Sequence, residues 1–145
     1  DYSQCTTEFD VDSGTTGTTL ANVVGMVTDT LQPGTYEVEI DLTLTSTANS
    51  GLKVALKFGT ASMLTSIDVT SLAFTASGVG VARATTATDA ASIQASTAAI
   101  IKCIIKGHLV VAVAGTLQLQ AAQNASHADN TTIRTGSFMK FTKRA

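Results

Sequence analysis

The residue types that support catalysis or metal binding are few in this sequence and widely separated. The only histidines are His108, at the boundary of a predicted strand, and His127, in a polar loop. This pair lacks the ligand spacing of a metal site. Serine and aspartate are abundant, but no G-x-S-x-G sequence presents a nucleophile and no G-x-x-x-x-G-K-[ST] sequence forms a phosphate loop. We therefore expect no catalytic activity and no cofactor.

Alternating acidic residues near the start of the chain resemble the beginning of a calcium loop. Glu8, Asp10 and Asp12 are followed by Gly14. The full calcium-binding loop ends in a bidentate glutamate, which this segment lacks. We interpret the segment as a solvated acidic stretch.

The two cysteines predict a reduced protein. Cys5 and Cys103 lie far apart, and the chain does not have the cysteine spacing of a small disulfide-stapled scaffold. Cys103 stands between Ile101 and Ile105 with a period of two. That pattern predicts a buried strand position in which cysteine acts as a small hydrophobic residue.

Composition restricts the classes of partner. Charged residues make up 14% of the chain and the net charge is −2, so no excess of positive charge exists to neutralise nucleic acid phosphates. The most apolar stretch, residues 98–115, is interrupted by Lys102, Lys106 and His108, which argues against a membrane span. No signal-peptide pattern is present. The first residue is Asp1 rather than methionine, which predicts that an upstream segment has been removed or lies outside this sequence.

The clearest structural signal is two neighbouring segments with alternating apolar and polar residues. They span residues 36–45 and 52–59 and are separated by a turn sequence at residues 48–51. Adjacent alternating segments joined by a turn predict an antiparallel hairpin. The charged residues expected to face each other across it are Glu37, Glu39 and Asp41 on one strand, and Lys53 and Lys57 on the other.

The remaining segments complete an all-β pattern of about eight strands, without a long helix. We expect a single antiparallel β-sandwich or jelly roll at residues 19–145, preceded by an extended N-terminal arm at residues 1–18. The other segments are residues 19–31, one or two strands and a turn; 61–74, a helical turn or a bent strand; 79–84, a short strand; 85–99, a loop leading into a strand; 100–106 and 109–120, two strands around Gly107; and 133–143, a closing strand kinked or bulged at Gly136.

Three short motifs resemble a known family. The sequence Ala-Gly-Thr-Leu-Gln-Leu-Gln-Ala-Ala-Gln-Asn at residues 114–124, followed after a polar loop by Gly-Ser-Phe-Met-Lys at 136–140, resembles the last hairpin of jelly-roll domains common in tailed-bacteriophage virion proteins. Leu-Gln-Pro-Gly-Thr-Tyr at residues 31–36 is similar to their turn into an early strand. These domains are related in architecture to tumour-necrosis-factor and complement globular heads. The resemblance implies trimers, phage particles and head-decoration or tail-fibre roles, and it brings no catalytic residues.

We therefore expect a structural virion protein of the capsid decoration type, which binds the outer surface of a phage head as a homotrimer. Its partners would be its own copies and the major capsid protein or another virion protein, with neither nucleic acid nor membrane. It would be made in the host cytoplasm and located on the capsid surface. The alternatives are a receptor-binding tip domain of a phage tail fibre and a non-catalytic carbohydrate-binding module. Either alternative would bind a glycan, and the fibre tip would bind a glycan of the host surface.

Two sets of residues are the candidates for assembly contacts. Tyr2 and Phe9 are the aromatic anchors expected to dock the arm on a neighbouring subunit or coat protein. The uncharged strand residues expected to line a trimer axis are Leu109, Val111, Val113, Leu117 and Leu119.

Overall fold

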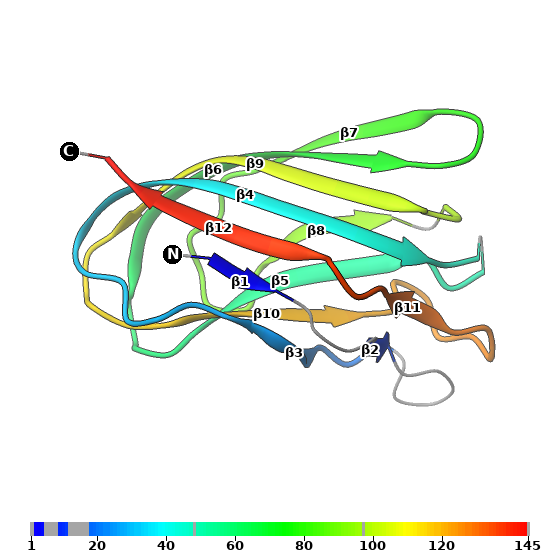
Figure 1. Ribbon diagram of the computed structural model, residues 1–145, viewed down its shortest axis with the longest axis horizontal. Helices are drawn as coiled ribbons and strands as arrows, with labels where there is room; N and C mark the ends of the chain where they lie inside the picture. The colour runs from blue at the N-terminus through cyan, green and yellow to red at the C-terminus, as the bar shows by residue number, and fades with distance from the viewer. Residues whose placement is uncertain (1, 5–8, 12–17, 48, 97, 145) are drawn as a thin grey trace.

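The computed structural model of the chain is a β-sandwich of two antiparallel sheets (Figure 1). The structure describes residues 18–47, 49–96 and 98–144, together with the backbone of residues 2–4 and 9–11. No helix occurs in these residues, so none there is long and apolar enough to cross a membrane.

The larger sheet has eight strands in the described part of the chain. Its main path runs β1 (Tyr2–Gln4), β12 (Phe138–Lys143), β4 (Gly34–Thr45), β9 (Lys102–Val111), β6 (Leu64–Phe74) and β7 (Val79–Ala84). Off this path, β11 (Thr131–Ile133) pairs with β4 and with β2 (Phe9–Val11). The smaller sheet runs β3 (Ala21–Val27), β10 (Leu117–Ala122), β5 (Leu52–Phe58) and β8 (Ser92–Ser96).

The chain passes repeatedly from one sheet to the other. From β3 onward it goes to β4, back to β5, across to the β6–β7 hairpin, back to β8, and then through β9 and β10 to β11 and β12. Each crossing brings another apolar strand face against the opposite layer. The all-β prediction and the sandwich are therefore confirmed for the described residues.

The hairpin predicted from residues 36–45 and 52–59 is wrong. Both segments are strands, but β4 lies in the larger sheet between β12 and β9, whereas β5 lies in the smaller sheet between β10 and β8. Alternation of apolar and polar residues indicates that one face of a strand is buried. Two strands on opposite sides of the same core show this alternation just as two paired strands do. The expected pairing of the β4 acids with Lys53 and Lys57 is consequently absent: Lys57 pairs with Asp89, and Lys53 Nζ donates to the Thr18 carbonyl.

Gly107 lies inside a strand and does not separate two. β9 runs unbroken through it, with Gly107 opposite Val38 of β4 and Val69 of β6. A Cβ at this position would stand 2.0 Å from the Asp68 carbonyl oxygen, so the absence of a side chain permits β6 to approach closely. Glycine inside a strand commonly marks such a close backbone approach.

The described residues form twelve strands rather than about eight. Within residues 61–74, which fitted either a helical turn or a bent strand, Leu64–Phe74 form the long strand β6. Gly136, with φ of 89°, lies in the turn that divides the expected closing strand into β11 and β12. The three-residue strands β1, β2 and β11 account for most of the remaining difference.

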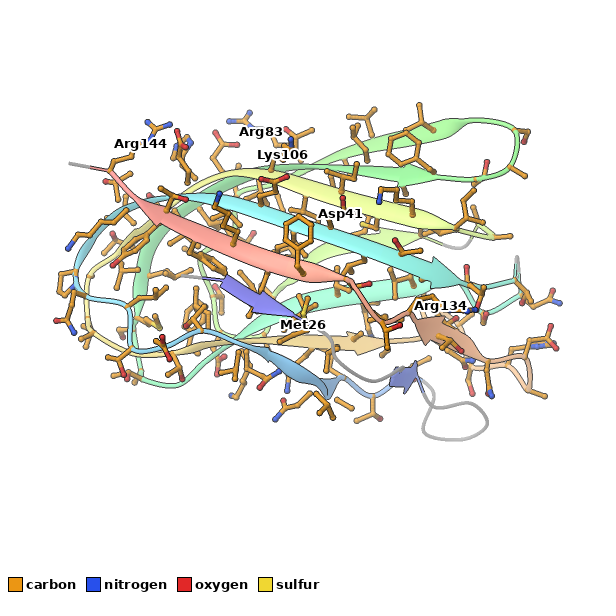
Figure 2. The ribbon with its side chains drawn as sticks, in the orientation of Figure 1. Met26, Asp41, Arg83, Lys106, Arg134 and Arg144 are labelled. Atoms are coloured by element: carbon orange, nitrogen blue, oxygen red, sulfur yellow. The ribbon has the colours of Figure 1, made fainter. Side chains whose placement is uncertain are left out.

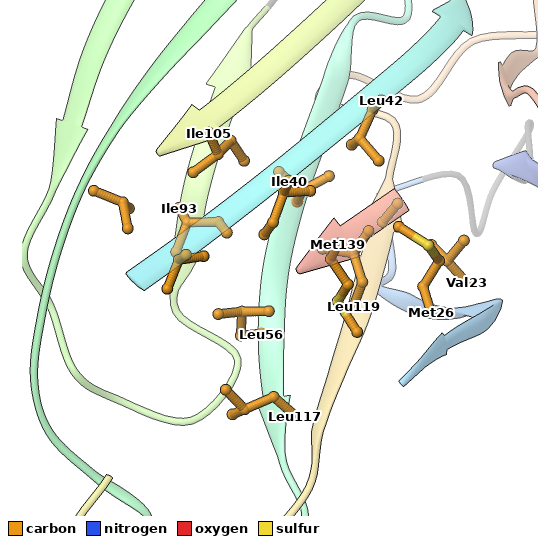
Figure 3. Packing of buried hydrophobic residues seen from close by; sticks show 14 of the residues in the cluster. Val23, Met26, Ile40, Leu42, Leu56, Ile93, Ile105, Leu117, Leu119 and Met139 are labelled. Atoms are coloured by element: carbon orange, nitrogen blue, oxygen red, sulfur yellow. The ribbon is translucent and has the colours of Figure 1, made fainter. Parts of the chain in front are cut away.

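The core lies between the two sheets (Figure 3). Ile40, Ile105 and Met139 of the larger sheet face Leu56 and Leu119 of the smaller sheet. The largest fully buried side chains are Phe141, Met26, Ile40, Leu42, Leu44, Leu52, Met63, Ile100, Ile105, Leu109, Leu117 and Leu119. Between β6 and β8 a polar contact joins the layers, because the buried Ser71 hydroxyl donates to Gln94 Oε1.

Candidate functional surface

The outer face of the larger sheet carries the most distinctive group of side chains. Ser71 and Ile105 are paired residues that point into the core, so their neighbours Leu72 and Ile104, also a pair, point outward. The strand register then places every second residue of β4, β9, β6 and β7 on the same outer face.

One part of this face is charged, and its charges form cross-strand ion pairs (Figure 2). Lys102 Nζ lies 2.6 Å from Asp41 Oδ1. Lys106 Nζ lies 3.7 Å from Glu39 Oε1, and Arg144 binds Glu37 at 2.8 Å. The strand β4 supplies the acid in each pair, while β9 and the end of the chain supply the bases. Exposed pairs of this kind stabilise the fold by at most about 1 kcal/mol each, so their main effect is to neutralise the face.

A fourth pair joins β6 to the edge strand β7. Arg83 donates from Nε and Nη2 to the two carboxylate oxygens of Asp68, at 2.8 and 2.7 Å. This bidentate bond holds the pKa of the Asp68 carboxyl below its usual value and raises the pKa of Arg83. The one charged side chain of β7 is thereby neutralised within the chain.

Beside the ion pairs, the same face is apolar. Leu72, Phe74 and Ile104 are half-buried, and Val79 and Val81 of β7 are 53% and 69% exposed. The pairs Leu72 with Val81 and Phe74 with Val79 are direct cross-strand neighbours, and Leu72 also pairs with Ile104. We call these five residues the apolar patch. A shallow hollow of about 230 Å³ at its margin is lined by Thr70, Leu72, Ile104 and Lys106.

A second, polar hollow lies toward the other side of the sheet. It has a volume of about 320 Å³ and occupies the surface over β12, β4 and β9. Its carboxylates and ammonium groups are already engaged in part by the Glu39–Lys106 and Glu37–Arg144 pairs. The lining residues are Glu37, Val38, Glu39, Lys106, Gly107, Lys140 and Thr142.

The residues expected to line a trimer axis are mostly used inside the chain. Leu109, Leu117 and Leu119 are 0% exposed and Val111 is 2% exposed, because β9 and β10 turn these side chains into the shared core. Val113, at 41%, is the member of the set that reaches the surface. The absence of charged residues on these strands therefore identified core positions.

The side chains of Tyr2 and Phe9 lie outside the described residues, as do Cys5, Glu8, Asp12 and Gly14. The backbone around the two aromatic residues is placed: β1 pairs with β12, and β2 pairs with β11. These parts of the arm thus extend the chain's own larger sheet. A role for Tyr2 and Phe9 in contacts with a neighbour stays a prediction.

Cys103 is a buried free thiol, as its period-two position predicted. Burial, with a smaller contribution from Asp41, raises the pKa of the Cys103 thiol to about 12. The thiolate required of a nucleophile is therefore suppressed at neutral pH.

The two histidines lie apart. His108 is on the exposed outer face of β9, next to Asp68 of β6, and His127 Nδ1 lies 3.3 Å from Asp129 Oδ2 in the loop before β11. Within the described ranges, no three His, Cys, Asp or Glu side chains gather as metal ligands would.

The apolar patch is the feature that sequence reasoning missed. Residues 79–84 were expected to form a strand and do, but their exposure on both faces was not anticipated. The sequence did contain a signal of this exposure. Gly80 and Ala82, the β7 residues on the core side of the sheet, are too small to fill a core.

Comparison with protein-family models, with curated proteins and with solved structures finds no match to this chain.

Proposed function

We propose that this chain is a non-catalytic structural virion protein of the capsid decoration type, which binds the outer surface of a phage head as a homotrimer. The observation that carries the proposal is the apolar patch beside a charge-neutralised surface on the outer face of the larger sheet. Exposed apolar groups of this kind, bordered by polar residues, are typical of protein–protein interaction sites. Neutralised charges lower the desolvation cost of covering the rest of the face.

The strand order supports a jelly-roll assignment for the sandwich. Strands β3, β10, β5 and β8 form one sheet, strands β1, β12, β4 and β9 lie side by side in the other, and the chain alternates between the layers. In this proposal the β6–β7 hairpin is an addition beyond β9. Jelly-roll domains of virion proteins, which the motifs at residues 31–36, 114–124 and 136–140 resemble, are the source of the expected threefold assembly.

The trimer contact is assigned to the outer face around Ile104. Ile104 lies between the Asp41 position of β4 and Leu72 of β6, near the middle of the sheet. A stable interface buries on the order of 1,200–2,000 Å² in total, so Ile104 would be at the centre of a larger contact that includes the ion-paired surface, with Val79 and Val81 of β7 outside that centre.

The experiment compares Ile104→Lys with Val24→Lys. Val24 is an exposed valine on the smaller sheet, so its substitution introduces the same charge on the opposite side of the molecule. We expect light scattering at micromolar concentration to give a trimer for the native chain and the Val24 variant, and a monomer for the Ile104 variant. Far-ultraviolet circular dichroism checks that all three are folded.

Binding to the particle is measured separately, with phage heads that lack the protein. We expect copies in groups of three on the outer surface and reduced occupancy for Ile104→Lys. Copies distributed singly would contradict the trimer. Deleting residues 1–18 and heating the decorated particles tests the arm: an unchanged release temperature would exclude it from attachment.

The tail-fibre tip and the carbohydrate-binding module are alternative proposals. The polar hollow at Glu37, Glu39, Lys106 and Lys140 offers hydrogen-bonding groups for a glycan, and this is the observation that favours them. Binding of the purified chain to an oligosaccharide array, lost on Lys140→Ala, would favour these alternatives over decoration.

A further inference from the structure

The strand β7 forms an open edge of the larger sheet. Among the described strands it pairs with β6 alone, in a continuous register from Val79 opposite Phe74 to Ala84 opposite Val69. Figure 1 shows the β6–β7 hairpin extending beyond the rest of the sandwich. Every β7 residue except Ala84 is exposed. Natural edge strands are commonly protected by charged side chains, proline or a bulge. β7 contains neither proline nor a bulge, and its one charged side chain, Arg83, is paired with Asp68 of β6.

The turn at the end of the hairpin determines which backbone groups of β7 are free. The Thr75 amide donates to the Gly78 carbonyl at 2.9 Å, which makes these two residues a hydrogen-bonded pair. Hydrogen-bonded and non-hydrogen-bonded pairs alternate along an antiparallel ladder. Gly80 and Ala82 therefore direct their amide and carbonyl groups toward β6. The N–H and C=O groups of Val79, Val81 and Arg83 point away from the sheet, at the open edge.

We infer that the β7 edge pairs with the β7 edge of a second copy of this chain, antiparallel and around a two-fold axis at Val81. In this register Val81 faces Val81 of the second copy, and Val79 faces Arg83 of the second copy. All three outward-directed residues of each strand are then hydrogen-bonded. Sliding one strand by two residues in either direction leaves one of the three without a β7 partner, so the centred register is the most complete.

The side chains fit the same register. A two-fold axis perpendicular to the sheet keeps both outer faces on one side, so Val79 and Val81 of the two copies form one apolar surface that joins their apolar patches. Gly80 and Ala82 face each other on the opposite side and are too small to clash. The Asp68 carboxylate already neutralises Arg83, so the pairing brings no uncompensated charge together.

The contact between two β7 edges is small, so we expect it to form mainly where copies of the chain are already held close together. One strand of six residues buries much less than the 1,200–2,000 Å² of a standard complex, so free copies should associate weakly. Copies already held on one surface have a high effective concentration, and the same contact then becomes effective. The pairing uses an edge whereas the proposed trimer uses a face, and it does not depend on the virion assignment.

The test is a charge exchange at Val81, because only the centred register places this residue opposite itself. Sedimentation equilibrium of the full chain would be run from about 10 μM to about 1 mM, the range of weak complexes. We expect association beyond the species present at the lowest concentration. Val81→Lys alone and Val81→Glu alone should each weaken it about tenfold, since like charges directly opposite repel. An equimolar mixture of the two variants should restore it.

A second substitution should act in the opposite direction. In a background of Asp68→Ala, which frees Arg83 from its own acid, Val79→Glu places a carboxylate opposite Arg83 of the second copy and should strengthen association, while Val24→Lys and Val24→Glu on the smaller sheet should leave it unchanged. Circular dichroism confirms folding of each variant.

The edge pairing is overturned if the Lys and Glu variants fail to complement each other, or if the native chain shows no added association at about 1 mM. A trimer that survives Val81→Lys and is lost in Ile104→Lys would support the proposed face contact whatever the outcome at the edge. Conversely, charge complementation at Val81 without any trimer would support the edge and contradict the proposed trimer.

Discussion

The strands β9 and β7 belong to the same sheet and are both apolar, yet their surroundings are opposite. β9 lies between β4 and β6, and its inward residues Cys103, Ile105 and Leu109 are 0% exposed. Among the described strands β7 pairs only with β6, and Val81 is 69% exposed. Covering by the second layer, rather than apolar composition, determines which strand stabilises the monomer and which stays exposed.

A glycine substitution in each strand should show the largest difference. Gly107→Ala in β9 places a Cβ 2.0 Å from the Asp68 carbonyl oxygen and 2.7 Å from Val69 Cα, both backbone atoms that cannot rotate away. We expect the free energy of unfolding to fall by about 3 kcal/mol, measured by urea denaturation. Gly80→Ala in β7 meets its nearest atom at 4.0 Å and should change stability by less than about 1 kcal/mol. Equal effects would show that β6 and β9 are not closely packed at Gly107.

Truncating one apolar side chain in each strand should show the next largest difference. Leu109→Ala removes a fully buried side chain from the core and should cost about 2–5 kcal/mol. Val81→Ala removes exposed atoms and should cost about 0.5 kcal/mol or less. Both values come from denaturation of dilute protein, where weak association does not contribute. A large cost for Val81→Ala in dilute solution would mean that β7 is covered within the monomer.

The smallest expected effect concerns the ion pair that joins β7 to β6. Because the hydrogen bond from Arg83 lowers the pKa of Asp68, Arg83→Ala should raise that pKa toward its usual value, as followed by NMR titration. A carboxylate with a lowered folded pKa stabilises the native state above the unfolded pKa and loses this contribution as the pH falls through the folded value. The stability difference between native chain and variant should therefore disappear in acid. Arg144→Ala, which removes the partner of Glu37, is the control that should leave Asp68 unchanged.

Much of the secondary structure follows from local pattern. The alternation over residues 36–45 and 52–59 predicted β4 and β5, and the position of Cys103 predicted its burial. Period two is a property of one strand with one covered face, so it is visible in a single segment. The same alternation does not indicate which strand pairs with which, and for this reason the prediction of a β4–β5 hairpin was wrong.

The candidate surface depended on relations between distant residues. The apolar patch joins Ile104 of β9 to residues of β6 and β7, and these become neighbours only through the sheet register. Likewise, the β4 acids find bases in Lys102, Lys106 and Arg144, far along the chain. Uncharged residues such as Leu109 and Leu119 were assigned to a trimer axis because sequence alone does not distinguish a core face from an interface.

Local sequence pattern is enough to predict an all-β chain, the position of most strands and the residues that become buried, because side-chain alternation and turn chemistry act over a few residues. The sheet that each strand joins, the close approach of β6 that requires a glycine at position 107, and the open edge of β7 become visible only in the folded chain. Those features depend on the pairing of segments separated by many residues. The free energy that favours one strand pairing over another comes from packing the whole core, so it cannot be read from any single segment.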